Sequence, residues 1–313
     1  MTKLVILIIL IIVIVVIILL IAEVPQYCST LYDYSNEQLV ERYKLKPKVS
    51  NSRVVISMTS IPERLDYIKP VLNSLFKQTM KVDEIALNIP YTSRKGVKYE
   101  IPGWMQQMDK REDIPLKIHR VDEDEGPGTK ILPTLRREKY DTLVIAVDDD
   151  NIYPSKMVEN LVYEFDRYGR KRAITNYGMV MKKPTTGPLP QFPFKYNRIL
   201  STMSPSREVD FVQGCTGFIV TPAMFPDQAL NIKNGPKEAL TVDDIWISGW
   251  LKMKKVKIMQ PAFNLRMVPL PHVESLKNTP SLIRGENGDR KNDLITIQWF
   301  RDKGVKLLYE KEN

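Results

Sequence analysis

The sequence predicts an α/β fold with a mainly parallel sheet flanked by helices. From Arg53 onward, short apolar runs rich in β-branched residues alternate with segments whose apolar residues have helical spacing. This alternation is typical of a parallel sheet with helices on both faces. The chain has 313 residues, of which 43% are hydrophobic and 27% charged, which is the composition of a folded globular protein with one large domain.

The predicted elements follow one another in a regular order in the first half of this region. We expect helices at 65–79 and at 155–168, the second with Ser155 as its N-cap. The strands expected before and between them are 53–58, 84–89, 116–121 and 142–147. The second half is less regular, with loops expected over 192–209. The strand-like segments there are 210–214 and 217–221, followed by a helix at 241–255.

The N-terminal segment predicts a membrane anchor. Residues 4–22 contain no charge, glycine or proline, and a helix of this length spans a hydrocarbon core of about 30 Å. The run is longer than the core of a cleaved signal peptide, and no small-residue cleavage site follows it. We therefore expect an uncleaved transmembrane signal anchor at 1–23, a stem at 24–52 and one domain at 53–313. Lys3 before the span places the N-terminus in the cytosol and the domain in the Golgi or endoplasmic reticulum lumen, or otherwise outside the cytoplasm.

Charge and cysteine content narrow the possible partners. The formal net charge of +9 favours anionic partners, although a basic solvated surface without a specific partner explains it equally well. The sequence has no zinc-finger spacing and no aromatic-plus-basic RNA-binding signature, so we expect no nucleic-acid partner. Cys28 and Cys215 form no C-x-x-C motif, and we expect two thiols, with pairing in an oxidising lumen as the alternative.

Three consecutive aspartates end the strand predicted at 142–147. In an extended chain Asp148 and Asp150 point to the same side, where their charges repel unless a cation lies between them. Mg²⁺ and Mn²⁺ bind in this way, through one or two carboxylates and substrate phosphates. A turn and helix cap is the structural alternative. The D-x-D nucleophile of dehalogenase-type phosphatases fits less well, because it lies on the first strand of its domain and a hydroxyl residue soon follows it.

The order of these segments resembles the GT-A class of nucleotide-sugar glycosyltransferases, of a family 2-like kind. The likeness covers residues 53 to about 275 and rests on "TSIPER" after the first strand, on the D-x-D motif in "VDDDN", and on a later "DD" before a helix. It implies transfer of a sugar from a nucleotide diphosphate sugar to an acceptor hydroxyl on a glycan, glycoprotein or glycolipid. It also implies Mn²⁺ or Mg²⁺. Asp150 would ligate the metal, and Asp148 would contact it through water or bind the ribose. Asp149 belongs to the same donor-binding segment, with its side chain pointing the other way.

By the same resemblance, the loop after the first strand holds the nucleotide. Thr59, Ile61 and Pro62 would pack around base and ribose, and Arg64 would reach base or phosphate. The structural alternative is a strand–turn–helix connection capped by Ser60.

Two further segments are expected on the donor and sugar side. Lys130 offers a mobile cation for a phosphate or a sugar carboxylate, although a solvated lysine on a first helical turn is an equal alternative. Gly214 and Gly217 would let the backbone approach a sugar ring, unless they mark a bulge or tight hairpin.

The same resemblance implies a general base for the acceptor and a further metal ligand. Asp244 would deprotonate the acceptor in an inverting displacement and Asp243 would support it, whereas in the structural alternative the pair only begins a helix. A retaining mechanism stays open. His272 would complete the metal site, or would be an exposed loop histidine. Trp246 and Trp250 are expected in the core.

Two other functions remain open at this point. One is a membrane-anchored carbohydrate-binding protein with an inactive transferase fold, which would use the same pocket without turnover. The other is a sugar nucleotidyltransferase, but such an enzyme carries a glycine- and lysine-rich loop after its first strand, and "TSIPER" is not one. The apolar N-terminal segment also argues against it.

Overall fold

The computed structural model describes residues 35–48, 50–181, 205–262, 269–271 and 290–308, together with Ile11 and Ile14. The predicted anchor at 1–23, residues 24–34 of the predicted stem with Cys28, the loop expected at 192–204 and His272 lie outside these residues, apart from Ile11 and Ile14, and stay predictions. The described residues contain no helix that is long and apolar enough to cross a membrane.

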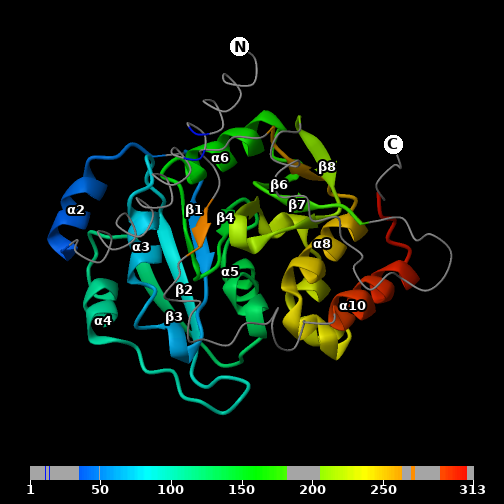
Figure 1. Ribbon diagram of the computed structural model, residues 1–313, viewed down its shortest axis with the longest axis horizontal. Coiled ribbons are helices and arrows are strands. Elements are labelled where there is room, and N and C mark those ends of the chain that lie inside the picture. The colour runs from blue at the N-terminus through cyan, green and yellow to red at the C-terminus, as the bar shows by residue number, and fades with distance from the viewer. Residues whose placement is uncertain are drawn as a thin grey trace.

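A mixed, mainly parallel sheet forms the centre of the described chain (Figure 1). Strand β1 pairs in parallel with β2 and β4, β2 with β3, and β6 with β11. Strand β10 runs antiparallel between β4 and β6, and β8 runs antiparallel beside β11. From edge to edge, the eight strands within the described residues are β3 (Leu116–Val121), β2 (Glu84–Pro90), β1 (Val54–Met58), β4 (Leu143–Ala146), β10 (Phe218–Val220), β6 (Ala173–Thr175), β11 (Ile258–Gln260) and β8 (Arg207–Val209).

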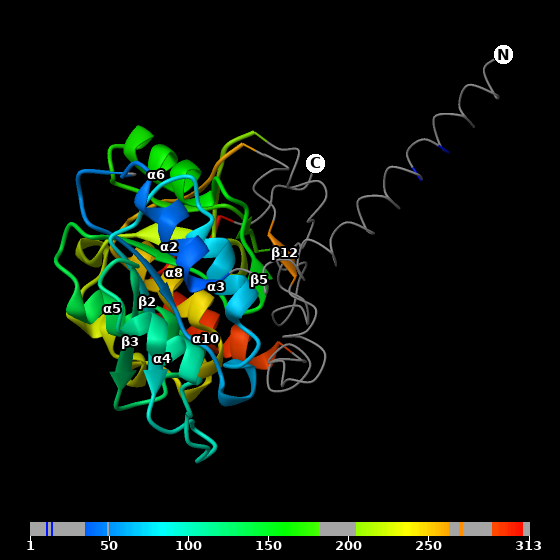
Figure 2. The same cartoon turned by 90° about the vertical axis from the view of Figure 1, so that its left-hand side faces the viewer.

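Helices lie on both sides of this sheet, as the alternating sequence pattern predicts. In Figure 1, α2 (Asn36–Lys44), α3 (Lys69–Phe76) and α4 (Gly103–Asp109) lie to the left of β1 and β2. Helices α5 (Leu132–Arg137), α8 (Asp243–Met253) and α10 (Lys291–Asp302) lie to the right. The view in Figure 2 brings the side with α2 and α3 toward the reader. Helix α6 (Met157–Arg167) packs near β6 and β10.

Two small ladders complete the architecture next to the main sheet. Strand β5 (Asn151–Ile152) pairs with β12 (Leu270–Pro271), and β7 (Gly178–Met179) pairs with β9 (Phe211–Val212). The first ladder places Pro271 opposite Asn151, directly after the three aspartates. A late segment of the chain is therefore held beside the end of β4.

The structure confirms the predicted strands and corrects several boundaries. The helix expected from residue 65 begins at Lys69, because residues 62–64 form a 3₁₀ turn and Pro70 suits the first turn of a helix. Ser155 is not the N-cap of α6: the cap position is Lys156, without a side-chain hydrogen bond, and a turn precedes it. Part of the loop region expected at 192–209 forms the edge strand β8.

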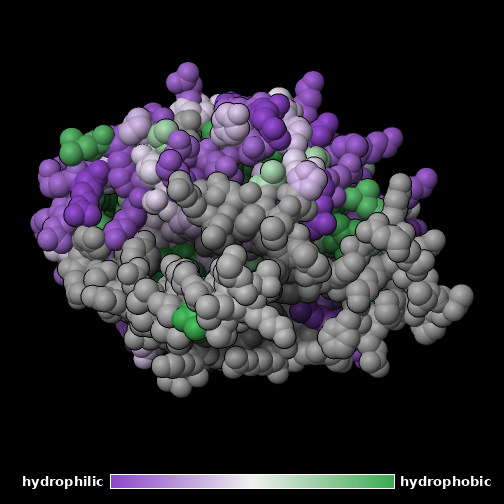
Figure 3. All heavy atoms as spheres, turned by 45° about the horizontal axis from the view of Figure 1, so that its top comes forward, coloured by the Kyte–Doolittle hydropathy of each residue, from purple (hydrophilic) through white to green (hydrophobic). Residues whose placement is uncertain are grey.

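The core is a continuous apolar layer on the sheet and helices. Strand β1 and strand β4 are fully buried along their length, which explains their near-continuous apolar sequence. Helix α2, within the predicted stem, packs on α3 through Leu39, Val40 and Tyr43. On the face shown in Figure 3, the described side chains are mostly hydrophilic and hydrophobic ones are scattered.

An aromatic cluster joins α8 to α10. Trp246 and Trp250 are buried, as the sequence predicted, and their rings meet edge to face at 5.5 Å between centroids. Trp299 and Phe300 from α10 pack on both of them. Gly249 lies in this contact, since a Cβ added there would come within 2.3 Å of the Phe300 ring. The cluster fixes the position of α8, whose first residues are the acidic pair Asp243 and Asp244.

We predict that Gly249→Ala destabilises the protein. Overpacking of a buried contact costs about 1–3 kcal/mol, and this exceeds the gain of about 1 kcal/mol or less for alanine over glycine in a helix. Denaturant unfolding of the full-length chain should show a lower free energy of unfolding. Gly103→Ala in the first turn of α4 is the matched control, because nothing lies within 4 Å of its added Cβ. A Gly249→Ala protein as stable as the parent would contradict the packing described here.

Candidate active site at the carboxyl ends of β1 and β4

Three chain segments meet where the parallel strands β1 and β4 end. The loop at 59–64 follows β1, and the aspartates at 148–150 follow β4. Strand β10 is antiparallel to β4, so the segment before it, residues 214–217, lies at the same edge. This edge is where ligands bind in open α/β sheets.

Lys130 lies between the two acidic segments and joins them. It ends the 3₁₀ helix η2 (Gly126–Lys130) instead of exposing its ammonium on a helical turn. Its Nζ is 2.7 Å from Asp148 Oδ1, 2.9 Å from Asp243 Oδ2 and 3.8 Å from Asp244 Oδ1, and its side chain is 5% exposed. Burial opposes ionisation of this ammonium, but the three carboxylates prevail and raise the pKa of Lys130 well above its usual value.

Gly214 makes room for this arrangement. A Cβ added at Gly214 would lie 2.2 Å from Lys130 Nζ and 2.9 Å from Asp148 Oδ1. The Gly214 N–H donates to Asp244 Oδ1 at 3.0 Å. Gly217 does not join the cluster: it has a φ of +85° and packs against Met157 of α6. Of the two predicted glycines, the structure brings only Gly214 to the acidic site.

A second cation, Arg64, binds the other two aspartates. Its Nη1 lies 2.7 Å from Asp149 Oδ1 and 3.4 Å from Asp150 Oδ2, and the side chain is 10% exposed. The Ser60 hydroxyl donates to Asp149 Oδ2 at 2.6 Å. Ser60 is thus not a helix cap, and Asp149 clamps the loop after β1 to the loop after β4.

The remaining residues predicted to hold the nucleotide lie in the same loop. The Thr59 hydroxyl donates to the carbonyl of Asn88 in β2 at 2.7 Å, which ties the loop to the neighbouring strand. Ile61 precedes the 3₁₀ turn η1 (Pro62–Arg64), and Pro62 begins it. Thr59, Ile61 and Pro62 are each partly exposed at the sheet edge. Their contacts with a nucleotide stay predictions.

The aspartates at 148–150 are not extended, contrary to the argument from strand alternation. Strand β4 ends at Ala146, and after Val147 and Asp148 the other two aspartates, Asp149 and Asp150, form a turn. Asp148 and Asp150 therefore face different cations: Asp148 pairs with Lys130 and Asp150 with Arg64. Next to the turn, the Asn151 amide donates to Asp150 Oδ1 at 2.7 Å.

Two carboxyls of the cluster have raised pKa values, because they are buried and lie beside other carboxylates. Burial and the neighbouring Asp149 and Asp148 raise the pKa of Asp150 to about 7, against the opposing effect of Arg64 and Lys130. Burial also raises the pKa of Asp244 to about 8, with Asp243 and Asp148 adding to the rise and Lys130 opposing it. The site therefore attracts further positive charge.

The residues present fit a divalent cation that shares its coordination with a phosphate ligand. Among the described residues, no group of three or more His, Cys, Asp or Glu side chains is arranged to hold a metal ion. A site of one or two carboxylates completed by substrate phosphates, typical of Mg²⁺ and Mn²⁺, does not need three. The buried Asp243 Oδ2 makes no hydrogen bond to a described residue, although it lies 2.9 Å from Lys130 Nζ. The Lys130 ammonium therefore offsets the charge of this oxygen.

Tyr153 is a site residue that the sequence did not reveal. Its hydroxyl accepts the N–H of Asp148 at 2.8 Å, and it lies 3.4 Å from the Cys215 carbonyl. The side chain is fully buried and connects the loop after β4 with the segment before β10. No local pattern marks it, because its partner Cys215 lies 62 residues away in the chain.

Comparison with known proteins identifies similar structures. No protein-family model and no curated protein sequence matches the chain. The mannosyltransferase PcManGT from Pyrobaculum calidifontis, in complex with GDP-Man and Mn²⁺, is 14% identical, with a TM-score of 0.49 over 92% of this chain and 74% of that chain. S. aureus TarS 1–349 with UDP is 16% identical, with a TM-score of 0.43 over 66% of this chain and 57% of its own. These are distant similarities in fold, with TM-scores below 0.5.

The raised pKa values predict a stability that falls with pH. Both carboxyls bind protons more tightly in the folded state than in the unfolded state, so each one lowers the free energy of unfolding as pH rises from about 4 to about 7 or 8. The slope is at most about 1.4 kcal/mol per pH unit for each group. In metal-free buffer, Asp244→Asn and Asp150→Asn should each reduce the slope and be more stable than the parent at pH 8.5.

Denaturant unfolding between pH 4 and pH 9 measures this dependence. Asp66→Asn, on the exposed surface after η1, is the control and should leave the slope unchanged. A parent slope that neither substitution alters would contradict the charge excess at the site.

Proposed function

We propose that this protein is a metal-dependent glycosyltransferase that moves a sugar from a nucleotide diphosphate sugar to an acceptor hydroxyl of a glycan, protein or lipid. One observation carries the proposal. Five aspartates, Asp148–Asp150 and the pair Asp243 and Asp244, come from two distant segments and meet around Lys130 and Arg64 at the ligand-binding edge of the sheet. Such an excess of carboxylates suits a divalent cation with a diphosphate better than it suits a structural ion pair.

On the donor side, the metal and Lys130 would supply positive charge, and the loop after β1 would hold the nucleotide. Asp150 and Asp148, with His272, would hold the metal, which is Mn²⁺ or Mg²⁺. When bound, the metal would offset the negative charge that develops on the leaving diphosphate. Lys130 would supply positive charge beside Asp148. Its ammonium would not have to move during the reaction, because Asp148 and Asp243 already hold it. Thr59, Ile61, Pro62 and Arg64 would contact base and ribose or phosphate.

On the acceptor side, Asp244 is the proposed general base. One of its oxygens, Oδ1, accepts the Gly214 N–H, and the side chain keeps 28% exposure, so it can reach a ligand. It would take the proton of the acceptor hydroxyl while the acceptor oxygen bonds to the anomeric carbon. The bond from that carbon to the diphosphate breaks in the same step, and the nucleoside diphosphate leaves with the electron pair. Attack from the opposite face inverts the anomeric configuration.

Asp243 has a supporting role in this scheme. Asp243 is 6% exposed and paired with Lys130. It would therefore orient the neighbouring Asp244 without reaching the acceptor itself. A raised pKa makes a carboxylate a stronger base, and the pKa of Asp244 is about 8.

We further propose that residues 4–22 anchor the enzyme in a membrane, with the catalytic domain on the luminal or extracytoplasmic side.

A donor screen tests the proposal. The full-length protein with Mn²⁺ and a panel of nucleotide diphosphate sugars should release a nucleoside diphosphate with at least one donor, and EDTA should abolish the release. Asp148→Ala/Asp150→Ala should lower the rate by about 10³-fold or more, because the site loses its metal-binding carboxylates. Asp141→Asn, exposed at the opposite end of β4, should leave the rate unchanged.

The outcomes separate the candidate functions. Binding of sugar without turnover in the parent protein would favour the carbohydrate-binding alternative. The absence of both binding and hydrolysis for every donor would exclude the transferase.

A second experiment tests the role of Asp244. Asp244→Asn keeps an oxygen that can accept the Gly214 N–H but removes the base, so we expect kcat to fall by about 10²–10⁴-fold. The dissociation constant for the nucleoside diphosphate should stay within about threefold. The product's anomeric proton, observed by NMR, should show inversion. A retained kcat, or retention of configuration, would exclude Asp244 as the base of a direct displacement.

A further inference from the structure

A buried polar cluster lies beneath the site and has no role in the function proposed above. Ser57 in β1, Asn88 in β2 and Thr134 in α5 are all fully buried, and we call them the carbonyl clamp. Apart from Ser57, strand β1 is apolar, so the clamp interrupts an otherwise hydrophobic layer. A buried polar group is unfavourable unless its hydrogen bonds are made.

Two members of the carbonyl clamp, Ser57 and Asn88, bind the main-chain carbonyl of Lys130, and Thr134 binds both of them. The Ser57 hydroxyl donates to the carbonyl of Lys130 and lies 2.6 Å from the Thr134 hydroxyl. The Asn88 amide reaches the same carbonyl at 3.3 Å, the Thr134 hydroxyl at 3.0 Å and the Ser57 hydroxyl at 3.2 Å. Lys130 is the last residue of η2, so the clamp fixes the carbonyl at the end of that turn.

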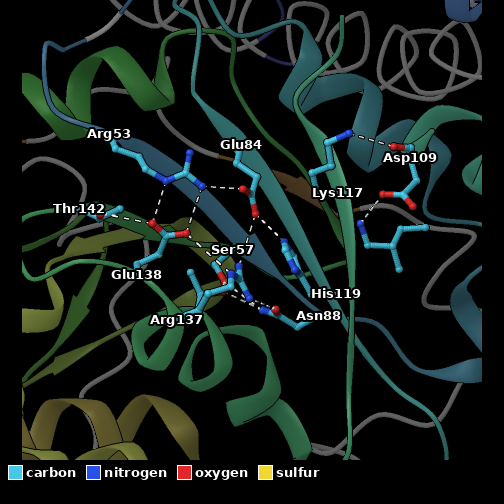
Figure 4. A network of polar contacts seen from close by, with 12 residues as sticks. Arg53, Ser57, Glu84, Asn88, Asp109, Lys117, His119, Arg137, Glu138 and Thr142 are labelled. Carbon is cyan, nitrogen blue, oxygen red and sulfur yellow. Dashed lines mark hydrogen bonds and ion pairs between the residues drawn. The ribbon is translucent and has the colours of Figure 1, made fainter. Parts of the chain in front are cut away.

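Arg137 fixes the orientation of the Asn88 side-chain amide. Its amide oxygen faces Arg137 Nη1 at 3.5 Å, which leaves the amide nitrogen for the clamp. Arg137 lies 3.4 Å from Glu84, and Glu84 also binds His119 and Arg53. Figure 4 shows Ser57 and Asn88 beside this ion-pair network, whose members come from β2, β3, the end of α5 and Arg53, the residue before β1.

We propose that the carbonyl clamp is a positioning device for Lys130. The clamp holds the backbone of Lys130 at one end, and Asp148 and Asp243 hold its ammonium at the other. A buried lysine with both ends fixed has one position, and that position lies between the donor-side and acceptor-side aspartates. The clamp residues touch no reacting atoms and act through Lys130. The consequence for donor binding rests on the proposed function, but the position of Lys130 is measurable without it.

The rate of chemical labelling shows whether the Lys130 ammonium is held in its buried, ion-paired position. In the parent protein, brief treatment with an amine-acylating reagent should leave Lys130 unmodified, because it is 4% exposed and ion-paired. In Asn88→Leu, which removes the amide from the clamp, Lys130 should be acylated at least about fivefold faster, as read by peptide mass spectrometry. Lys117, whose ammonium donates to the carbonyls of Asp109 and Arg111, is the control within the same molecule. Its rate should not change unless the whole protein unfolds.

Nucleotide binding then connects the clamp to the site. With Mn²⁺ present, Asn88→Leu should weaken nucleoside diphosphate binding by about tenfold, measured by calorimetry. In a Lys130→Met background the same change should have less than about a twofold effect, because the clamp then has no ammonium to position. Tyr43→Phe is the matched control, since it removes another buried hydroxyl, one that donates to the Val82 carbonyl. It should alter neither the labelling nor the binding.

The results separate the inference from the proposed function. Unchanged acylation of Lys130 in a folded Asn88→Leu protein overturns the positioning role, and so does an equal loss of binding with and without Lys130. A parent protein that binds no nucleoside diphosphate refutes the proposed function, and the labelling alone then decides the positioning. If Asn88→Leu does not fold, Ser57→Ala, which removes a single hydroxyl, provides the same two measurements.

Discussion

The structure depends most on the ion pairs of Lys130 at the edge of the sheet. One ammonium holds Asp148 after β4 and Asp243 at the start of α8, two segments that are far apart in the chain and meet only in the folded protein. Without that charge, the carboxylates would repel each other, and protons or another cation would have to offset the repulsion. The rest of the fold supports this contact: Gly214 leaves space for the ammonium, the aromatic cluster fixes α8, and the carbonyl clamp fixes the backbone of Lys130.

The same contact shows why the site is costly to the fold. Burial and the neighbouring carboxylates raise the pKa of Asp150 to about 7 and the pKa of Asp244 to about 8, although Lys130 and Arg64 supply opposing positive charge. A sheet edge that needed only to be stable would carry fewer buried carboxylates. Local arrangements that cost stability are concentrated at functional sites, where a ligand supplies the missing interaction. A divalent cation with a diphosphate would supply it here.

Much of the fold was predictable, because burial on both faces gives parallel strands a recognisable apolar run. β1, β2, β3 and β4 were found in this way, and the helix predicted at 241–255 was found from its aromatic residues on one face. The meeting of the loops after β1 and β4 also followed, since strands that run in parallel present their ends at one edge. The roles of the predicted residues in binding and catalysis stay predictions.

Other features depend on contacts between distant segments, and local patterns do not contain them. The turn at Asp149 and Asp150 forms because Arg64 and Ser60 bind the aspartates from another loop. Tyr153 and the carbonyl clamp are single polar residues in apolar surroundings, and their partners are as many as 77 residues away. The sequence also offered no means of choosing between Gly214 and Gly217, which differ in what packs against them and in the positive φ of Gly217.

A crystal structure of the protein with Mn²⁺ and a nucleoside diphosphate tests the central claim most directly. The account predicts an anomalous peak for Mn²⁺ at Asp150, with Asp148 nearby, and a diphosphate in contact with Lys130. A diphosphate bound elsewhere, or Mn²⁺ at a site that excludes the aspartates after β4, would contradict it.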